Sequence, residues 1–220
     1  TSKAHTGICF RLPYPTGAHC DDACNWEAVD KHTTTIVTQN ESSAVLKHTL
    51  DSTEYFVILY WEGKATFNEK AKHYFVLTPM DDHLAFTCAF TSTAPSTQPV
   101  TVAQTQEEAK NYWNSFWKEG AAVDFSACTD PRAKELERRV VLSQYLLAIQ
   151  SAGTIPPQET GLTYNSWFGK FHLEMIWWHE AQFALWNRSN LLDRTLGWYE
   201  KVEPIARQMA QRAGCEGGRW

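Results

Sequence analysis

The secondary structure that the sequence favours changes near residue 95, and this change limits the folds open to the chain. Residues 53–63, TEYFVILYWEG, form an apolar run rich in β-branched and aromatic side chains, and the run ends at a glycine. Residues 72–79 and 83–93 have a similar composition, with the turn-forming cluster PMDDH between them. We therefore predict strands at these three segments, in an antiparallel β-sandwich that this part of the chain builds only in part.

Helical patterns follow the connector TAPSTQPV at 93–100, which is rich in Pro, Ser and Thr. In residues 105–120 the apolar side chains recur at helical spacing. Thr105 and Glu108 have the spacing of a capping box, and Gly120 is a natural end. We predict a helix over this segment.

Residues 130–153 carry a second helical pattern, with Asp130 as the predicted cap, Pro131 at the first helical position and Gly153 at the end. A third helix is predicted for 171–186, after the loop TIPPQETGLTYNSWFGK. A last helix is predicted from Asn190, with Pro204 either kinking it or opening a new helix, and with Gly214 as its stop.

Together these patterns predict an α+β chain of several domains. No internal repeat is apparent. The predicted segments are a β-sandwich domain at 1–95, a linker with a helix at 96–129, and helices packed together at 130–220.

The charge and hydropathy of the chain exclude some function classes. The net charge of −5 and the pI near 5.9 argue against nucleic-acid binding, which usually needs a basic face. No apolar stretch approaches the roughly 20 residues of a membrane-spanning helix. We predict neither a nucleic-acid partner nor a membrane partner.

The most unusual segment is SWFGKFHLEMIWWHEAQFALW, residues 166–186, which combines four Trp with two His and two Glu. On a helix from Phe171 the apolar residues occur all round, which predicts burial on most sides. Burying ionisable groups without partners costs several kcal/mol, so they pair with each other or face a wet cleft. These groups are His172, Glu174, His179 and Glu180.

Three other interpretations of this segment stay open. His172 and His179 could bind a metal with Glu174 or Glu180, although seven residues separate them and not the four of an H-E-x-x-H helix. The polar groups could be buried hydrogen-bonding residues, and the Trp side chains could fill a core. A serine nucleophile lacks its G-x-S-x-G turn. No metal and no cofactor are predicted.

The six cysteines permit two interpretations. The pair in CDDAC, Cys20 and Cys24, could form a small-loop disulfide in an oxidising compartment, or all six could be free thiols. A zinc site is not indicated, because no second CxxC or pair of His lies nearby.

The order of these segments resembles the six-hairpin glycoside hydrolases, in particular enzymes like α-L-fucosidases and the trehalase and maltose phosphorylase group. The resemblance covers roughly residues 55–220 and is most specific from PPQETGL to WWHE. It implies an N-terminal β-sandwich joined by linker helices to an (α/α)6 toroid. Only about half of a twelve-helix ring fits after residue 100, so the resemblance implies a piece of a longer polypeptide, or a chain whose partner completes the toroid.

The resemblance also implies a function, the inverting hydrolysis of a glycosidic bond in an oligosaccharide or glycoconjugate. The alternative is a non-catalytic carbohydrate-binding protein on the same scaffold. In these families the acid and base carboxylates come later in the chain, so no residue is assigned to either role. A secreted or periplasmic location is expected, and Asn40 and Asn187 begin N-x-S sequons.

The resemblance places the sugar pocket in the unusual segment. His172 and Glu174 match the His and Asn/Asp positions of a fucosidase-like H-x-N-x-N stretch, with Glu174 in place of the usual Asn. Trp178 and His179 match the Trp-Asp pair of a phosphorylase-like F-W-D-T-E stretch, with His179 in place of Asp. Glu180 is predicted to bind substrate as well. The predicted rim of the pocket is formed by Gln158, Glu159, Tyr164, Asn165 and Trp167.

Overall fold

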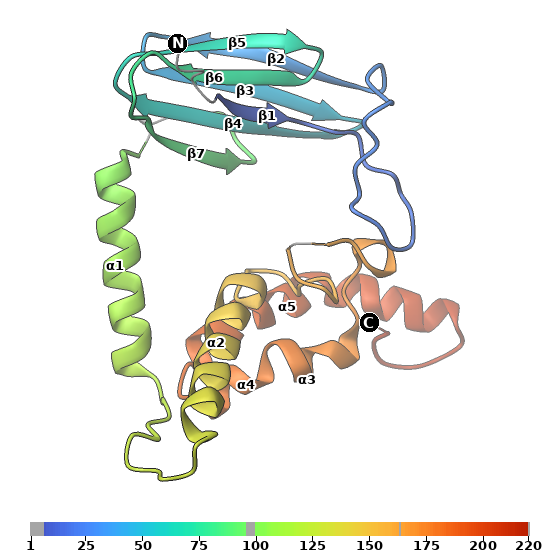
Figure 1. Cartoon of the computed structure of the whole chain (residues 1–220). Coiled ribbons are helices and arrows are strands. Elements are labelled where there is room, and N and C mark those ends of the chain that lie inside the picture. Colours follow the sequence, from blue (N-terminus) through green and yellow to red (C-terminus); the bar gives the residue numbers. More distant parts are fainter. Residues whose placement is uncertain (1–6, 96–99, 163, 220) are drawn as a thin grey trace. The chain divides into compact units, whose positions relative to one another are not determined.

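The structure is a computed structural model that describes residues 7–95, 100–162 and 164–219 (Figure 1). The predicted connector at 93–100 therefore lies partly outside the described residues, and so does Trp220. The architecture is α+β, as predicted, with strands before residue 95 and helices after residue 100.

The chain divides into two compact units. The first consists mainly of Ala23–Tyr112 and the second mainly of the residues from Trp113 onward. The boundary therefore falls inside α1 (Val102–Glu119). The short segment Gly17–Asp22 belongs to the second unit, although it lies near the start of the sequence.

The first unit contains two antiparallel sheets. One has four strands in the order β2-β3-β4-β7, and the other has three in the order β1-β6-β5. The strands are β1 (Ile8–Arg11), β2 (His32–Gln39), β3 (Ser43–Leu50), β4 (Thr53–Glu62), β5 (Ala65–Ala71), β6 (Tyr74–Pro79) and β7 (Ala85–Thr91).

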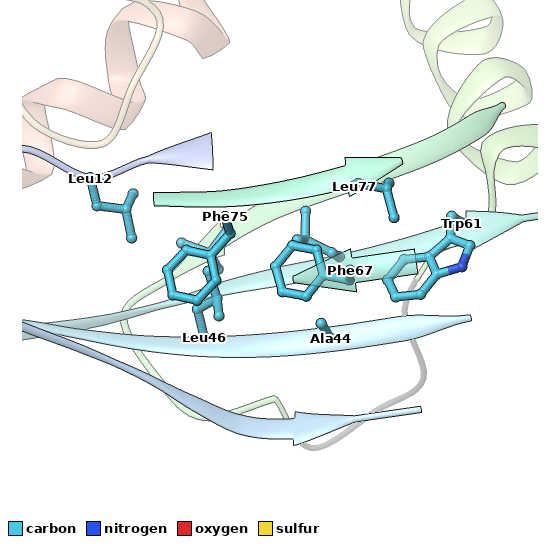
Figure 2. Close-up of a cluster of buried hydrophobic side chains, with 9 residues drawn as sticks. Leu12, Ala44, Leu46, Trp61, Phe67, Phe75 and Leu77 are labelled. Atoms are coloured by element: carbon cyan, nitrogen blue, oxygen red, sulfur yellow. The ribbon is translucent and has the colours of Figure 1, made fainter. Parts of the chain in front are cut away.

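One hydrophobic core joins the two sheets. In β4 every second side chain from Val57 to Trp61 is buried, which is the period of a strand with one face covered. Val57, Leu59 and Trp61 from the four-stranded sheet pack in the same cluster as Phe75 and Leu77 from the three-stranded sheet. Figure 2 shows labelled side chains of both sheets pointing toward one another.

The three predicted strands are confirmed as β4, β6 and β7, with ends shifted by at most two residues. Four more strands were not predicted. β2 and β5, for example, are short of aliphatic side chains and largely exposed, so the alternation that identifies a strand is weak in them.

The first two helices are confirmed, but their caps differ from the prediction. α1 begins at Val102, one turn early, because Thr101 and Gln104 form the capping box: each side chain bonds the other residue's backbone N–H. α2 (Ala133–Ser151) begins after Pro131. Asp130 does not cap it directly but accepts hydrogen bonds from the backbone and guanidinium of Arg132.

The predicted helix at 171–186 is wrong as a continuous element. Glu180, with φ −127° and ψ −38°, interrupts it, so the segment consists of short turns. The burial predicted on most sides is also wrong, because Trp177, Trp178 and Leu185 are exposed. The short helices here are η2 (Leu173–Met175), α3 (Ile176–His179) and α4 (Ala181–Leu185), and the 3₁₀ turn η1 (Trp167–Gly169) precedes them.

The last helix, α5 (Ser189–Arg212), is a single element that runs through Pro204 and ends before Gly214. It neither starts at Asn190 nor restarts at Pro204. A second core forms here from Phe116, Phe183 and Leu191, which come from α1, α4 and α5. Phe183 is the residue of the unusual segment that packs in this core.

Two further predictions have an outcome in the fold. None of the six cysteines is in a disulfide, so the CDDAC disulfide is not formed and the thiol interpretation holds. Among the described helices, none combines the length and the apolar character needed to cross a membrane.

Candidate functional site

All ten predicted pocket residues belong to the second unit, between Gln158 and Glu180. Their side chains fall into three groups: those that hold a loop together, those that are exposed, and one that is buried. Several of them surround a short aromatic turn.

The loop that precedes the turn is held by its own side chains. The amide of Gln158 donates to the carbonyl of Gly161 at 2.6 Å, and its oxygen accepts from the backbone of Ser166 at 3.5 Å. The hydroxyl of Thr160 donates to the carbonyl of Tyr164. Gln158 therefore shapes the loop.

Asn165 fastens this loop to the segment Gly17–Asp22. The backbones of Asn165 and Asp21 exchange two hydrogen bonds, at 3.1 and 3.2 Å, as in an antiparallel bridge. The side-chain amide of Asn165 also donates to the carbonyl of Ala18 at 3.1 Å. Asn165 thus fixes the position of the residues that follow it.

Those residues form the turn Trp167–Gly169, in which three successive residues have a positive φ. Trp167 has φ +49° and Phe168 has φ +61°, a region that costs a bulky side chain roughly 1 kcal/mol or more. Gly169, at φ +67°, tolerates it. Strain of this kind persists only where the surroundings impose it, and it concentrates at ligand sites.

The strained turn presents two aromatic side chains to solvent. Trp167 and Phe168 are each about half exposed. Both rings contact His19 edge-on, with centroids 4.5 Å and 5.1 Å from the imidazole. Trp167 also contacts the ring of His172, with centroids 5.5 Å apart. The result is an aromatic surface held by Gly17–Asp22, in which Trp167 contacts two imidazoles.

His172 and Glu174 lie beside this surface. Nδ1 of His172 is 4.0 Å from a carboxylate oxygen of Glu174, whose side chain is largely exposed. Nε2 of His172 is buried and has no hydrogen-bond partner in the described part of the chain. A polar atom of this kind needs a partner that the described residues do not supply.

The WWHE sequence contains two kinds of environment. Trp177 and Trp178 are exposed, whereas the imidazole of His179 donates from Nε2 to the carbonyl of Glu159 at 3.0 Å. His179 and Glu159 therefore join α3 to the loop. Within the described residues, His172 and His179 do not converge with a third ligand, so the alternative metal site is not formed there.

Glu180 is the buried member of the set, with only 1% of its surface exposed. Burial raises the pKa of its carboxyl to about 7, and Thr195 offsets this effect only in part. Neither carboxylate oxygen makes a hydrogen bond of normal geometry to the described residues. Tyr199 lies close enough that the charge of Glu180 adds to burial in raising the pKa of the phenol.

Among the described residues, several buried polar atoms of this segment make no hydrogen bond of normal geometry: Nε2 of His172, both carboxylate oxygens of Glu180 and Nε2 of Gln182. The sequence did not identify His19, Phe168 or Gln182 as site residues. Phe168 adjoins a predicted residue, but His19 lies far away in sequence and no pattern connects it to the turn.

Comparisons with known protein families, with curated proteins and with solved structures found no match to this chain. The site is therefore interpreted from its own geometry and chemistry.

Proposed function

We propose that the protein acts on carbohydrate, as a glycoside hydrolase-like protein that hydrolyses a glycosidic bond in an oligosaccharide or glycoconjugate with inversion. The observation that carries this proposal is the strained, half-exposed pair Trp167 and Phe168, next to His172, whose buried Nε2 has no hydrogen-bond partner among the described residues. Sugars offer both of the groups that such a surface binds.

The groups of a sugar match the side chains of this site. One face of a pyranose ring carries C–H groups that pack on an aromatic ring, while its edges carry hydroxyls that donate and accept hydrogen bonds. Trp167, Trp178 and Phe168 supply aromatic faces, and His172, Glu174 and Glu180 supply polar atoms. Because the carboxyl of Glu180 has a pKa of about 7, it holds a proton on about half of the molecules at pH 7 and can donate as well as accept.

For the fold, we propose that the two sheets belong to a β-sandwich and that the helices are the first part of an (α/α)6 toroid. The shared core of the sheets supports the first part. The second is supported by the large apolar side chains that α2 leaves exposed: Leu136, Leu142, Tyr145, Leu146 and Ile149. The rest of a longer polypeptide, or a partner chain, would cover this face.

A secreted or periplasmic location is part of the proposal, because enzymes that degrade sugars are commonly exported. Both sequon asparagines, Asn40 and Asn187, are exposed, which is compatible with glycosylation in a eukaryotic secretory route. The amide of Asn187 donates to the carbonyl of Glu119 at 3.1 Å, so glycosylation there would remove this contact.

The experiment is a screen of disaccharides and aryl glycosides against the purified protein, with release of reducing sugar as the readout. We expect turnover of at least one glycoside, and NMR of the first product should show the inverted anomer. Trp167→Ala should lower turnover at least tenfold. Trp26→Ala, which removes an exposed Trp of the first unit, is the matched control and should leave turnover unchanged.

Binding without turnover is the second candidate. One observation favours it: of the two carboxylates in the segment, Glu174 is exposed and Glu180 is buried, so they do not form a matched acid–base pair facing one cleft. Quenching of tryptophan fluorescence by a sugar, with no product from any glycoside, would decide for this candidate. Neither binding nor turnover across the panel would reject both.

A further inference from the structure

Three histidines of the first unit come together in its interior. His32 is the first residue of β2, His48 lies in β3, and His73 lies in the turn between β5 and β6. All three are buried. His48 is paired with Thr34 across the β2–β3 ladder, and both side chains are on the face that His32 shares. The cluster therefore links the four-stranded sheet to the β5–β6 turn of the other.

Their nitrogen atoms have the spacing of a metal site. Nδ1 of His32 lies 3.2 Å from Nε2 of His48, and each of the three imidazoles offers a nitrogen within 4.8 Å of the others. Two nitrogens bound to one tetrahedral Zn²⁺ at 2.0–2.1 Å are about 3.3 Å apart. The pair His32–His48 already has this separation.

Two of the remaining ring nitrogens bond protein groups, as in known zinc sites, where a ligand histidine bonds a protein group through its other nitrogen. Nε2 of His73 donates to the carbonyl of Val29 at 2.9 Å, which leaves Nδ1 for a metal. Nδ1 of His48 lies 2.6 Å from the hydroxyl of Thr34, which leaves Nε2. These contacts fix both rings.

We propose that His32, His48 and His73 bind a divalent transition-metal ion of the Zn²⁺ type through three imidazole nitrogens. A set of three imidazole nitrogens selects Zn²⁺, Cu²⁺ or Ni²⁺ over Mg²⁺ and Ca²⁺, which prefer oxygen. The ion would cross-link the two sheets and stabilise the first unit. It has no part in the carbohydrate site, which lies in the other unit.

Metal binding requires one rearrangement. The rings of His32 and His73 are stacked, with centroids 3.7 Å apart and an interplanar angle of 22°. The lone pair of an imidazole nitrogen lies in the plane of its ring, so the lone pairs of two stacked rings cannot point at the same ion. The ring of His73 must therefore rotate before His32 and His73 can bind one ion. Its Nδ1 now lies 2.8 Å from the hydroxyl of Thr34. The competing arrangement is a metal-free network of hydrogen bonds through Thr34.

The test uses tag-free protein, stripped of metal with a chelator and titrated with Zn²⁺ by calorimetry and with Co²⁺ as a spectroscopic probe. We expect one tight site per chain and a melting temperature raised by at least about 3 °C at saturation. The Co²⁺ spectrum should be that of a tetrahedral nitrogen site, without the near-ultraviolet band of thiolate ligands.

His73→Asn is the informative variant, because Asn tolerates the left-handed backbone of His73, φ +60°, and preserves the turn. It should weaken Zn²⁺ binding at least tenfold, with an unchanged circular dichroism spectrum, and His32→Gln should do the same. His83→Asn, at an exposed position outside the cluster, is the control and should bind like wild type. Absence of binding, or equal affinity in His73→Asn and wild type, would overturn the proposal in favour of the metal-free network.

Discussion

The backbone N–H of Phe168 donates a hydrogen bond to the carbonyl of His19, 3.0 Å away. Together with the bridge between Asp21 and Asn165, this bond holds the aromatic turn against a segment that is remote in sequence. Trp167 and Phe168 keep a backbone conformation that neither side chain favours alone. The turn is therefore imposed by its surroundings, which is what makes it a candidate site.

Phe168→Gly separates strain from binding. Glycine adopts φ +61° without penalty, so the melting temperature should stay the same or rise slightly, while loss of the aromatic ring should weaken carbohydrate binding at least tenfold. Ala23→Gly, at another residue with a positive φ, is the control and should leave binding unchanged. Unaltered sugar binding by Phe168→Gly would remove Phe168 from the site.

Glu174→Gln and Trp178→Ala test two predicted pocket residues. Each should weaken sugar binding or turnover at least tenfold, about 1.4 kcal/mol. Both side chains are largely exposed, so neither substitution should disturb the fold. Titration calorimetry with the best sugar from the screen, beside thermal melts, checks this. A shifted melting temperature with unchanged binding would mean that the residue has a structural role only.

The sequence predicted the fold where side-chain period and turn chemistry decide it. β4, with alternate residues buried, and α1, with its apolar spacing, follow from local patterns. The break at Glu180 does not, because helical spacing continues through 171–186 and tertiary packing overrides it. The sequence also did not predict the histidine cluster or the contact between His19 and the aromatic turn. His32, His48 and His73, like His19 and Trp167, are separated in sequence and meet only through the fold.

Gly120 and Gly197 give a matched pair of stability predictions. A Cβ at Gly120 would overlap the guanidinium of Arg188, a buried group that donates to the carbonyl of Phe116 at 2.9 Å and to Gln144 at 2.6 Å. Gly120→Ala should therefore destabilise the protein by about 1–3 kcal/mol. Gly197, inside α5, has open space around its Cβ position, so Gly197→Ala should stabilise by about 0.5–1 kcal/mol. Urea unfolding of both variants checks the opposite signs.

The exposed apolar face of α2 should bind hydrophobic dyes. Leu142, Leu146 and Ile149 are each about 40% exposed, at helical spacing that places them together. A protein of residues 1–220 should enhance dye fluorescence, because contiguous apolar patches of a few hundred Å² are rare on soluble monomers. Replacing Leu142 and Leu146 by Lys should reduce the fluorescence, whereas replacing exposed Met80 should not. A monomer of 1–220 that binds no dye would contradict the proposal that further helices cover this face.

Glu180 should make the stability of the protein depend on pH. The carboxyl has a pKa of about 7 in the folded protein, against 4.5 when unfolded, because burial disfavours its charge. Below pH 4.5 the carboxyl is protonated in both states, so its ionisation does not lower the free energy of unfolding. Between pH 4.5 and 7 the unfolded state binds fewer protons, so the free energy of unfolding falls as the pH rises, by about 3 kcal/mol in total. Glu180→Gln removes the charge but keeps the shape.

The variant should therefore be more stable than wild type at pH 8 by up to about 3 kcal/mol, and close to wild type at pH 5. Comparing urea unfolding of the two proteins at both pH values isolates this carboxyl, because every other titrating group is common to both. A constant difference between Glu180→Gln and wild type would mean that Glu180 is ionised in the folded protein at pH 5. In that case a polar partner would stabilise the buried carboxylate of Glu180, in place of protonation.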